Sequence, residues 1–317
     1  MISFEHVTKR YEGAPHPAVD DLSLDIPEGR TVVLIGPSGC GKSTTLRMVN
    51  RLIEPDAGTV SEDGRDVRDF PPEQLRRHVG YAIQGVGLFP HFSVAENIAV
   101  VPKLLGWDAE RTSARITELL ELVGLSASDY ADKYPDELSG GEAQRVGVAR
   151  ALAADPPVLL MDEPFGAVDP LTRERLQAEF VAIQARLRKT VVFVTHDIDE
   201  AVKLGDHIAI MREGRLVQYD TPERILAYPA DEFVAGFVGA ERALKRLSLA
   251  PVSEALDSAE GATSGAATVP LDSSLRTALA RIIEYGVPVV GVTDESGALV
   301  GSVSVDSIVE RFKRPLA

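Results

Sequence analysis

Residues 36–44 read Gly36-Pro37-Ser38-Gly39-Cys40-Gly41-Lys42-Ser43-Thr44. This stretch fits G-x-x-x-x-G-K-[S/T], the pattern of a phosphate-binding loop. The apolar, mostly β-branched run at residues 31–35 leads directly into it and predicts a strand buried on both faces. Residues 44–49 follow it and predict a helix. Strand, glycine loop and helix in this order are the context that the motif requires.

The residue types of this loop suit a nucleotide and its metal ion. The glycines let the backbone approach an anion and aim several N–H groups at it. The N-terminus of the following helix adds about half a positive charge. Lys42 supplies an ammonium group for the β- and γ-phosphates, and the hydroxyl of Ser43 can reach Mg²⁺. The alternative is a glycine-rich strand-to-helix turn without a ligand, which the Lys-Ser pair disfavours.

Composition restricts the remaining classes of protein. The chain has 317 residues, enough for two domains at about 150 residues each. It is 44% hydrophobic and 26% charged, as in ordinary globular proteins, and no apolar run is long enough to cross a membrane. The N-terminus lacks the features of a signal peptide, and the single cysteine, Cys40, excludes an internal disulfide and is interpreted as a small side chain rather than a redox switch. The net charge of −15 argues against a nucleic-acid partner.

The pattern along the chain predicts an α/β fold. Alternating residues at 2–7 and 22–26 predict antiparallel strands, and residues 58–67 predict a short hairpin. Helical periodicity runs from about residue 92 to 152. Buried strands are predicted at 79–84, 158–161, 191–195 and 208–211. Because helical stretches separate these strands, the sheet should be mostly parallel and covered.

A pair of carboxylates ends one of these strands. Residues 158–161 are apolar, and Asp162 and Glu163 follow directly. Asp162 can hold Mg²⁺ through water, and Glu163 can act as a general base on an attacking water. The alternative interpretation is a solvated turn, which the phosphate-binding loop upstream makes the weaker of the two.

Further motifs carry a resemblance to the ATP-binding subunits of ABC transporters, over residues 1 to about 240. Residues 138–142, Leu-Ser-Gly-Gly-Glu, resemble the LSGGQ motif with Glu142 at its last position. Gln84 matches the Q-loop, residues 166–169 match the D-loop, and His196 matches the switch histidine. Tyr11 falls where an aromatic ring stacks on adenine. Each of these residues, taken alone, has a simpler interpretation. Ser-Gly-Gly can be a helix cap, the histidine and the glutamine can be ordinary polar residues, and the tyrosine can be an aromatic residue in a loop.

The resemblance implies a P-loop ATPase with a RecA-like core, an antiparallel β-subdomain and a helical subdomain at about 88–155. It implies catalytic roles for Glu163, His196 and Gln84, and Mg²⁺ ligation by Ser43, Gln84 and Asp162. ATP would be held by the loop of one subunit and by the motif of a second copy in a head-to-tail dimer. The nucleotide-binding residues implied are Tyr11, Gly36, Pro37, Ser38, Gly39, Cys40, Gly41, Lys42, Ser43, Thr44, Ser139, Gly140, Gly141, Glu142 and Asp169.

Residues 241–317 are expected to form a linker and a second, small α+β domain. Their helix–strand–strand–helix order resembles a single CBS domain. One copy alone would leave a sheet face uncovered, so it is expected to pair with the copy on the other subunit. Three roles remain open for it: sensing ionic strength, binding an adenine nucleotide, or dimerisation alone.

Residues 80–91 resemble the Q-loop region of importers for quaternary-amine osmoprotectants such as glycine betaine, choline and carnitine, although Gly85 stands where a second glutamine is frequent. The resemblance therefore implies integral-membrane permease subunits, indirectly a substrate-binding protein, and a peripheral place at the cytoplasmic face of the inner membrane.

Two alternative functions remain. One is an importer ATPase for another solute, such as an amino acid, a polyamine or an anion. The other is a non-transport ABC ATPase, which the lack of sustained heptads and of a second nucleotide domain disfavours.

Overall fold

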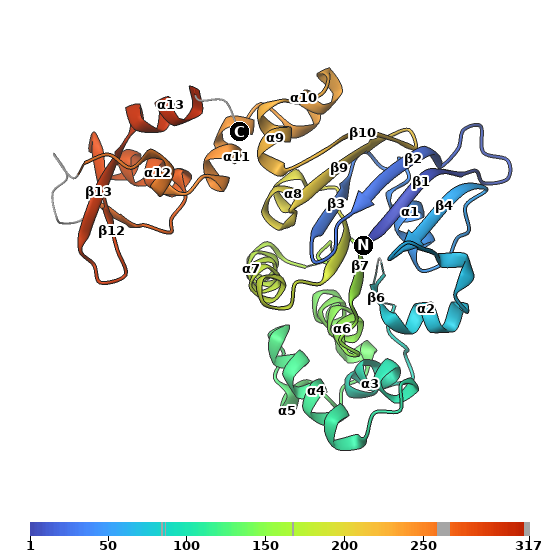
Figure 1. Cartoon of the computed structure of the whole chain (residues 1–317). Coiled ribbons are helices and arrows are strands. Elements are labelled where there is room, and N and C mark those ends of the chain that lie inside the picture. The colour runs from blue at the N-terminus through green and yellow to red at the C-terminus, as the bar shows by residue number, and fades with distance from the viewer. Residues whose placement is uncertain (84, 86, 167, 259–266, 314–317) are drawn as a thin grey trace. The chain divides into compact units, whose positions relative to one another are not determined.

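The computed structural model describes the chain except for residues 84, 86, 167, 259–266 and 314–317. It divides into two compact units, Met1–Pro222 and Glu223–Ala317, which are taken separately below (Figure 1). Gln84 and residue 167, which belongs to the D-loop motif, therefore lie outside the described residues.

A six-stranded sheet forms the centre of the first unit, in the order β10-β9-β3-β8-β7-β6. Its strands are β3 (Thr31–Ile35), β6 (Val79–Ala82), β7 (Val158–Asp162), β8 (Thr190–Val194), β9 (His207–Arg212) and β10 (Arg215–Asp220). All neighbouring pairs are parallel except β9 and β10. The predicted mostly parallel sheet is confirmed.

An antiparallel sheet accompanies it, in the order β2-β1-β4-β5. It consists of β1 (Ile2–Lys9), β2 (Val19–Ile26), β4 (Ala57–Glu62) and β5 (Arg65–Asp66). The register of β1 shifts between Phe4 and Val7, and His6 there adopts a φ of 50°. This bulge explains why the buried residues Phe4 and Val7 are three positions apart in a strand whose side chains alternate.

Helices fill the space around both sheets. They are α1 (Lys42–Val49), α2 (Pro72–His78), α3 (Val94–Leu104), α4 (Ala109–Leu122), α5 (Ala127–Tyr130), α6 (Gly140–Leu152), α7 (Pro170–Leu187) and α8 (Ile198–Leu204), with short 3₁₀ turns at Val67–Asp69 and Pro135–Glu137. Helix α1 contacts β4 of one sheet and β7 and β8 of the other, so it lies between them. Helix α6 packs on β6, and α3 and α4 pack on α6, which forms a helical layer beside the sheet edge.

The central strands are buried on both faces, as the apolar runs predict. Val32, Leu34, Val192 and Val194 belong to the large core that surrounds α1. The alternate residues face the opposite side, where the ring of Phe193 meets those of Phe165 and Phe180 at centroid distances of 5.9 and 6.1 Å. Both sets are fully or nearly fully buried, and this burial fixes the register of the strands.

A buried asparagine shapes the segment between β6 and α3. Asn97 lies in the first turns of α3 with no exposed surface. Its Nδ2 donates to the carbonyls of Phe89, Phe92 and Ser93 at 3.0–3.1 Å, and its Oδ1 accepts from the N–H of Phe89 at 2.8 Å. One side chain, whose two amide protons are shared among three carbonyls, thereby contacts four backbone groups of a segment that has no regular structure of its own.

The second unit holds a three-stranded sheet, in the order β11-β12-β13, with β11 (Thr268–Pro270) parallel and β13 (Leu299–Ser304) antiparallel to β12 (Val289–Thr293). Its helices are α9 (Pro222–Ala227), α10 (Glu232–Val238), α11 (Arg242–Leu249), α12 (Leu275–Tyr285) and α13 (Val305–Lys313), with a 3₁₀ turn at Val252–Ala255.

The division between the units falls earlier in the chain than the predicted boundary near residue 240. The reason is visible in the ion pairs of Glu223. Its Oε1 lies 3.4 Å from Nη2 of Arg311 and 3.8 Å from Nη2 of Arg246, which ties α9 to α13 and α11. The prediction near residue 240 rests on a change of composition there, whereas these ion pairs join α9 to helices that follow it in the chain.

Within the described residues, no helix combines the length and the apolar character needed to span a bilayer.

Replacing Asn97 with alanine should destabilise the first unit by about 2–3 kcal/mol, because buried backbone groups lose their partner. Urea unfolding followed by circular dichroism measures the change. Lys103→Ala, at an exposed position of the same helix, is the control and should stay within about 0.5 kcal/mol of the wild type. Equal stability of the two variants would contradict the role assigned to Asn97.

Candidate functional site

The glycine loop connects β3 to α1, where the sequence places it. Gly41 adopts a φ of 105°, and a Cβ atom there would lie 2.2 Å from the carbonyl oxygen of Ala18. Only glycine fits this position, because both the backbone angle and the close approach exclude a side chain. Helix α1 begins at the next residue, so its N-terminal N–H groups open toward the loop.

The ammonium group of Lys42 lies against the inside of this loop. Its Nζ donates to the carbonyls of Gly36 at 2.8 Å and Pro37 at 3.0 Å, and the side chain is buried. The same Nζ is 3.7 Å from Sγ of Cys40, whose pKa is raised by burial. The loop therefore holds a fixed positive charge beside backbone N–H groups, as the binding of a polyphosphate requires.

A hydroxyl and a carboxylate meet next to this charge. The Ser43 Oγ donates to Asp162 Oδ1 at 2.9 Å. Asp162 is fully buried, and burial raises the pKa of its carboxyl group. Its Oδ2 has no hydrogen-bond partner among the described residues and lies 3.6 Å from Nη2 of Arg47. A buried carboxylate with an unused oxygen beside a hydroxyl matches the hard oxygen ligands that Mg²⁺ takes, so these two residues fit the ion.

Glu163 and His196 follow the ends of β7 and β8. Oε1 of Glu163 lies 3.5 Å from Nδ1 of His196, and the side chain of His196 is largely exposed. The turn that contains His196 is held because the N–H of Asp197 donates to Oγ1 of Thr195 at 3.1 Å. A carboxylate and an imidazole are the group types that act as general bases and acids on a water molecule.

One open hollow brings most of these side chains together. Its volume is about 600 Å³, and it is lined by Tyr11, Ala18, Ser38, Gly39, Cys40, Gly41, Lys42, Ser43, Thr44, Glu163 and His196. Tyr11 stands at its rim, with its hydroxyl 3.3 Å from Oγ1 of Thr44 and about two fifths of its surface exposed. A ring placed there can stack on a base whose phosphates lie in the loop.

Besides Gln84, eight of the predicted site residues are not among those that line this hollow: Gly36, Pro37, Asp162, Ser139, Gly140, Gly141, Glu142 and Asp169. Ser139 caps α6: its Oγ accepts from the N–H of Glu142 at 3.3 Å, and Glu142 Oε2 accepts from the N–H of Ser139 at 2.7 Å. Asp169 caps α7 by accepting from the N–H of Thr172 at 3.1 Å, which lowers the pKa of its carboxyl group. Gly140 and Gly141 open α6. Gln84 lies outside the described residues.

Two polar contacts of α6 were not predictable from its local sequence. The hydroxyl of Tyr130 donates to Glu142 Oε1 at 2.5 Å, and Nε2 of Gln144 donates to the carbonyl of Glu163 at 2.8 Å. Gln144 is almost completely buried. A glutamine within an otherwise apolar helix face was the available signal, but its partner is 19 residues away and only the fold identifies it.

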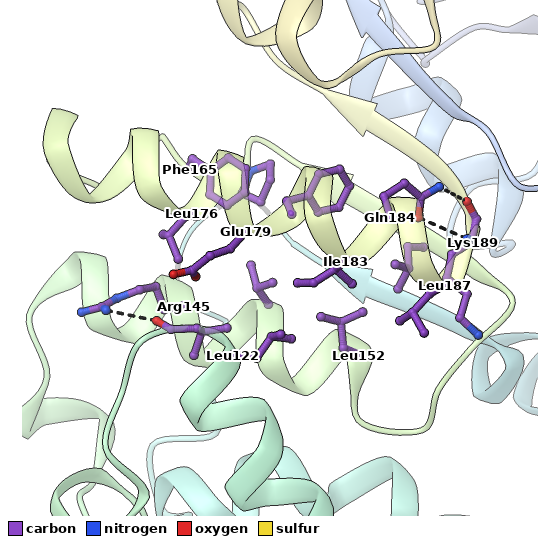
Figure 2. Close-up of a pocket in the computed structure, with 15 residues that line it drawn as sticks. Leu122, Arg145, Leu152, Phe165, Leu176, Glu179, Ile183, Gln184, Leu187 and Lys189 are labelled. Atoms are coloured by element: carbon purple, nitrogen blue, oxygen red, sulfur yellow. Dashed lines mark hydrogen bonds between the residues drawn. The ribbon is translucent and has the colours of Figure 1, made fainter. Parts of the chain in front are cut away.

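A second cavity lies between α4, α6, α7 and β7 (Figure 2). Its wall is mainly apolar, with Leu122, Leu152, Phe165 and Ile183 facing inward, and charged groups stand near its ends. None of the predicted site residues lines it. Because its wall offers few hydrogen-bond donors, the hollow at the glycine loop is the better phosphate site.

The fold and the hollow define a P-loop ATPase cassette, and comparisons with known proteins agree. A family model described as ABC transporter matches residues 19–166, and one described as CBS domain matches residues 262–314. The chain is 48% identical over 306 residues to the osmoprotectant import ATP-binding protein OsmV of Salmonella typhimurium, covering 96% of this chain and 79% of that protein. It is 48% identical over 310 residues to the glycine betaine uptake system ATP-binding protein YehX of Escherichia coli, covering 98% and 99%.

A solved structure shares the architecture of the first unit. It is the dimeric ATP-binding cassette MJ0796 in a post-hydrolysis state bound to ADP and Pi, with a TM-score of 0.65 and 32% identity, covering 70% of this chain and 99% of that one. The chain belongs to the ABC transporter family, as an ATP-binding subunit. It is thus an ATPase coupled to transport, and its C-terminal unit contains a CBS domain.

Replacing Tyr130 with phenylalanine should change the titration of Glu142. The Tyr130 hydroxyl, followed by the N–H and hydroxyl of Ser139, lowers the pKa of Glu142 from 4.5 to about 2. Because this pKa is lower in the folded chain, the contact stabilises fully above pH 4.5 and is lost as the pH falls toward 2. In Tyr130→Phe the pKa should rise toward 4.5, measured by NMR titration of the Glu142 carboxyl. Tyr134→Phe, a neighbouring exposed tyrosine, should leave that pKa unchanged.

Proposed function

We propose that this chain hydrolyses MgATP to energise an importer of quaternary-amine osmoprotectants. The ATPase part of this proposal rests on one observation. Lys42, Glu163 and His196 line the same hollow at the glycine loop. The solute class is supported by the relatives, since OsmV is described as an osmoprotectant import protein and OpuCA of Bacillus subtilis as a glycine betaine/carnitine/choline transport protein. The latter is 47% identical over 99% of this chain.

Each group of the hollow has a role in hydrolysis. The N–H groups of residues 36–44 and the ammonium of Lys42 neutralise the phosphates, and Tyr11 stacks on the adenine. Glu163 accepts a proton from water as its oxygen attacks the γ-phosphorus and the bond to the ADP oxygen breaks. His196, 3.5 Å from Glu163, hydrogen-bonds to the γ-phosphate or the attacking water.

Ser43 and Asp162 would hold Mg²⁺, with Gln84 as a further ligand. When bound, the ion would neutralise negative charge on the phosphates of the nucleotide.

The predicted site residues at the starts of α6 and α7 act on a second copy of the chain. Ser139, Gly140 and Gly141 place the N-terminus of α6 at the surface, where it offers N–H groups to a γ-phosphate held elsewhere. Glu142 fixes this helix end, and Asp169 lies at the start of α7. A head-to-tail dimer in which each chain completes the other's site accounts for this separation, and the matched cassette structure is itself dimeric.

The dimer would sit at the cytoplasmic face of the inner membrane, bound to integral-membrane permease subunits and, through them, to a substrate-binding protein. The CBS domain would regulate this assembly by pairing with the same domain of the second subunit. Apolar side chains that remain exposed on α12 and α13, Ile283, Val305 and Val309, support self-association. Pairing is compatible with binding an adenine nucleotide or with sensing ionic strength.

Glu163→Gln should abolish most ATP turnover while ATP binding persists, because the amide cannot accept the proton. A loss of about 100-fold in kcat is expected, within the range typical of a general base. Coupled-assay kinetics measure turnover, and light scattering with ATP detects the trapped dimer. Glu110→Gln, at an exposed position of α4, is the control. A Glu163→Gln variant that turns over at the wild-type rate would remove Glu163 as the base.

The solute class has its own test. The ATPase activity of the transporter reconstituted with its permease and substrate-binding protein should rise with glycine betaine, choline or carnitine outside the vesicles. Spermidine, glutamate and inorganic anions should leave the rate at its basal value. Stimulation by one of these latter solutes and not by the quaternary amines would contradict the osmoprotectant assignment and leave the ATPase assignment intact.

A further inference from the structure

The backbone of Glu163 adopts a conformation that most residues avoid. Its φ is 50°, in the left-handed region, and such a residue costs about 1–3 kcal/mol unless its surroundings hold it there. Three hydrogen bonds do so. The N–H of Glu163 donates to the carbonyl of Val194 at 3.0 Å, and its carbonyl accepts from the N–H of Gly166 at 3.2 Å and from Nε2 of Gln144 at 2.8 Å.

The hydrogen bond from Gln144 differs from the other two, because its donor is a side chain and because that side chain belongs to a separate helix, α6. Its amide is nearly completely buried, and a buried amide gains more from a hydrogen bond than an exposed one does. It lies five residues beyond Ser139, which is about 7.5 Å along the axis of α6 at the usual rise per residue. The helix that begins at the LSGGQ-type motif therefore contacts the backbone of Glu163 in the same chain.

The next residue of α6, Arg145, makes its hydrogen bonds to a different part of the chain. Nη1 of Arg145 donates to the carbonyls of Val123 and Gly124 at 3.1 Å, at the end of α4. Arg145, Val148 and Leu152 line the small apolar cavity between α6 and α7 (Figure 2). Gln144, by contrast, joins α6 to the end of β7 by a direct hydrogen bond.

We infer that Gln144 is a positioning residue for ATP hydrolysis: its amide holds Glu163 in the left-handed conformation that aims the carboxylate at the hollow, and it ties this conformation to the placement of α6. The inference rests on the proposed function, in which Glu163 is the base. Because α6 presents Ser139 to the nucleotide of the second subunit, a shift of α6 at one site changes the position of Glu163 at the other. Gln144 is thereby a link between the two sites of the dimer.

Gln144→Leu tests this link, since leucine keeps a similar volume and has no donor. The expected result is a fall in kcat of at least about 10-fold with a KM for ATP within about twofold of the wild type, because the base is displaced and the phosphate cradle is not. The matched control is Gln184→Leu. Gln184 also donates from Nε2 to a backbone carbonyl, that of Lys189, but at the far end of α7. This control should lose stability and keep its kcat.

Two further variants separate positioning from a general loss of structure. Gln144→Glu places a carboxylate against the carbonyl of Glu163, and only its protonated form can donate. Its kcat relative to that of the wild type should therefore rise as the pH is lowered from 8 to 6, whereas the deficit of Gln144→Leu should not change with pH. In the Glu163→Gln background, Gln144→Leu should add no further loss, because the group that it positions is already absent.

The outcomes distinguish this inference from the proposed function. If Glu163→Gln is nearly inactive while Gln144→Leu and Gln144→Glu both turn over at the wild-type rate, Gln144 has no positioning role and the base assignment stands. If Glu163→Gln is fully active, the assignment of Glu163 as the general base is wrong, and the inference about Gln144, which rests on that assignment, is wrong with it. Additive losses in the double variant, or an equal fall in kcat in Gln184→Leu, would also overturn the inference. Should Gln144→Leu fail to fold, the pH profile of Gln144→Glu decides.

Discussion

The parallel pairing of three neighbouring strands is the constraint on which the candidate site depends. In the register of the sheet, Leu34 of β3 lies opposite Val194 of β8, and Val194 lies opposite Asp162 of β7. The three strands therefore end side by side at the same edge of the sheet. The glycine loop, His196 and the Asp162–Glu163 pair each follow one of these ends, so hydrogen bonds between strands bring them together although up to 160 residues separate them in the chain.

Burial gives these groups their chemical character. Lys42 and Asp162 are charged side chains with almost no exposed surface, and both occur beside opposite charge or hydrogen-bonding groups, which makes their burial tolerable. The unused oxygen of Asp162 is the exception, and an unsatisfied buried carboxylate oxygen is what a cation would compensate. The strained backbone of Glu163 is a second local cost, offset by contacts from β8, from the turn at Gly166 and from α6.

Much of the fold was predictable because its strands are short apolar runs and its loop carries a specific motif. The mostly parallel sheet, the antiparallel pair at the N-terminus and the helical stretch at about 92–152 are confirmed. The boundary between the units was predicted near residue 240 from a change of composition there, whereas the compact units divide after Pro222. Helices α9, α10 and α11 thus fall in the second unit, and the long-range ion pairs that join them to it, such as Glu223 with Arg311, leave no local pattern in the sequence.

By itself, the sequence determined the identity of the phosphate-binding groups and the order in which strands, loop and carboxylates follow one another. These features are local, since a glycine at a positive φ, a β-branched run or a residue after a strand is encoded within a few positions. Only the tertiary structure decided that Gln144 contacts Glu163, that Tyr130 contacts Glu142, and that Ser139 and Asp169 do not line the hollow of their own chain. Such contacts depend on how α6 packs beside β6, and packing is set by the whole core rather than by any single stretch of the chain.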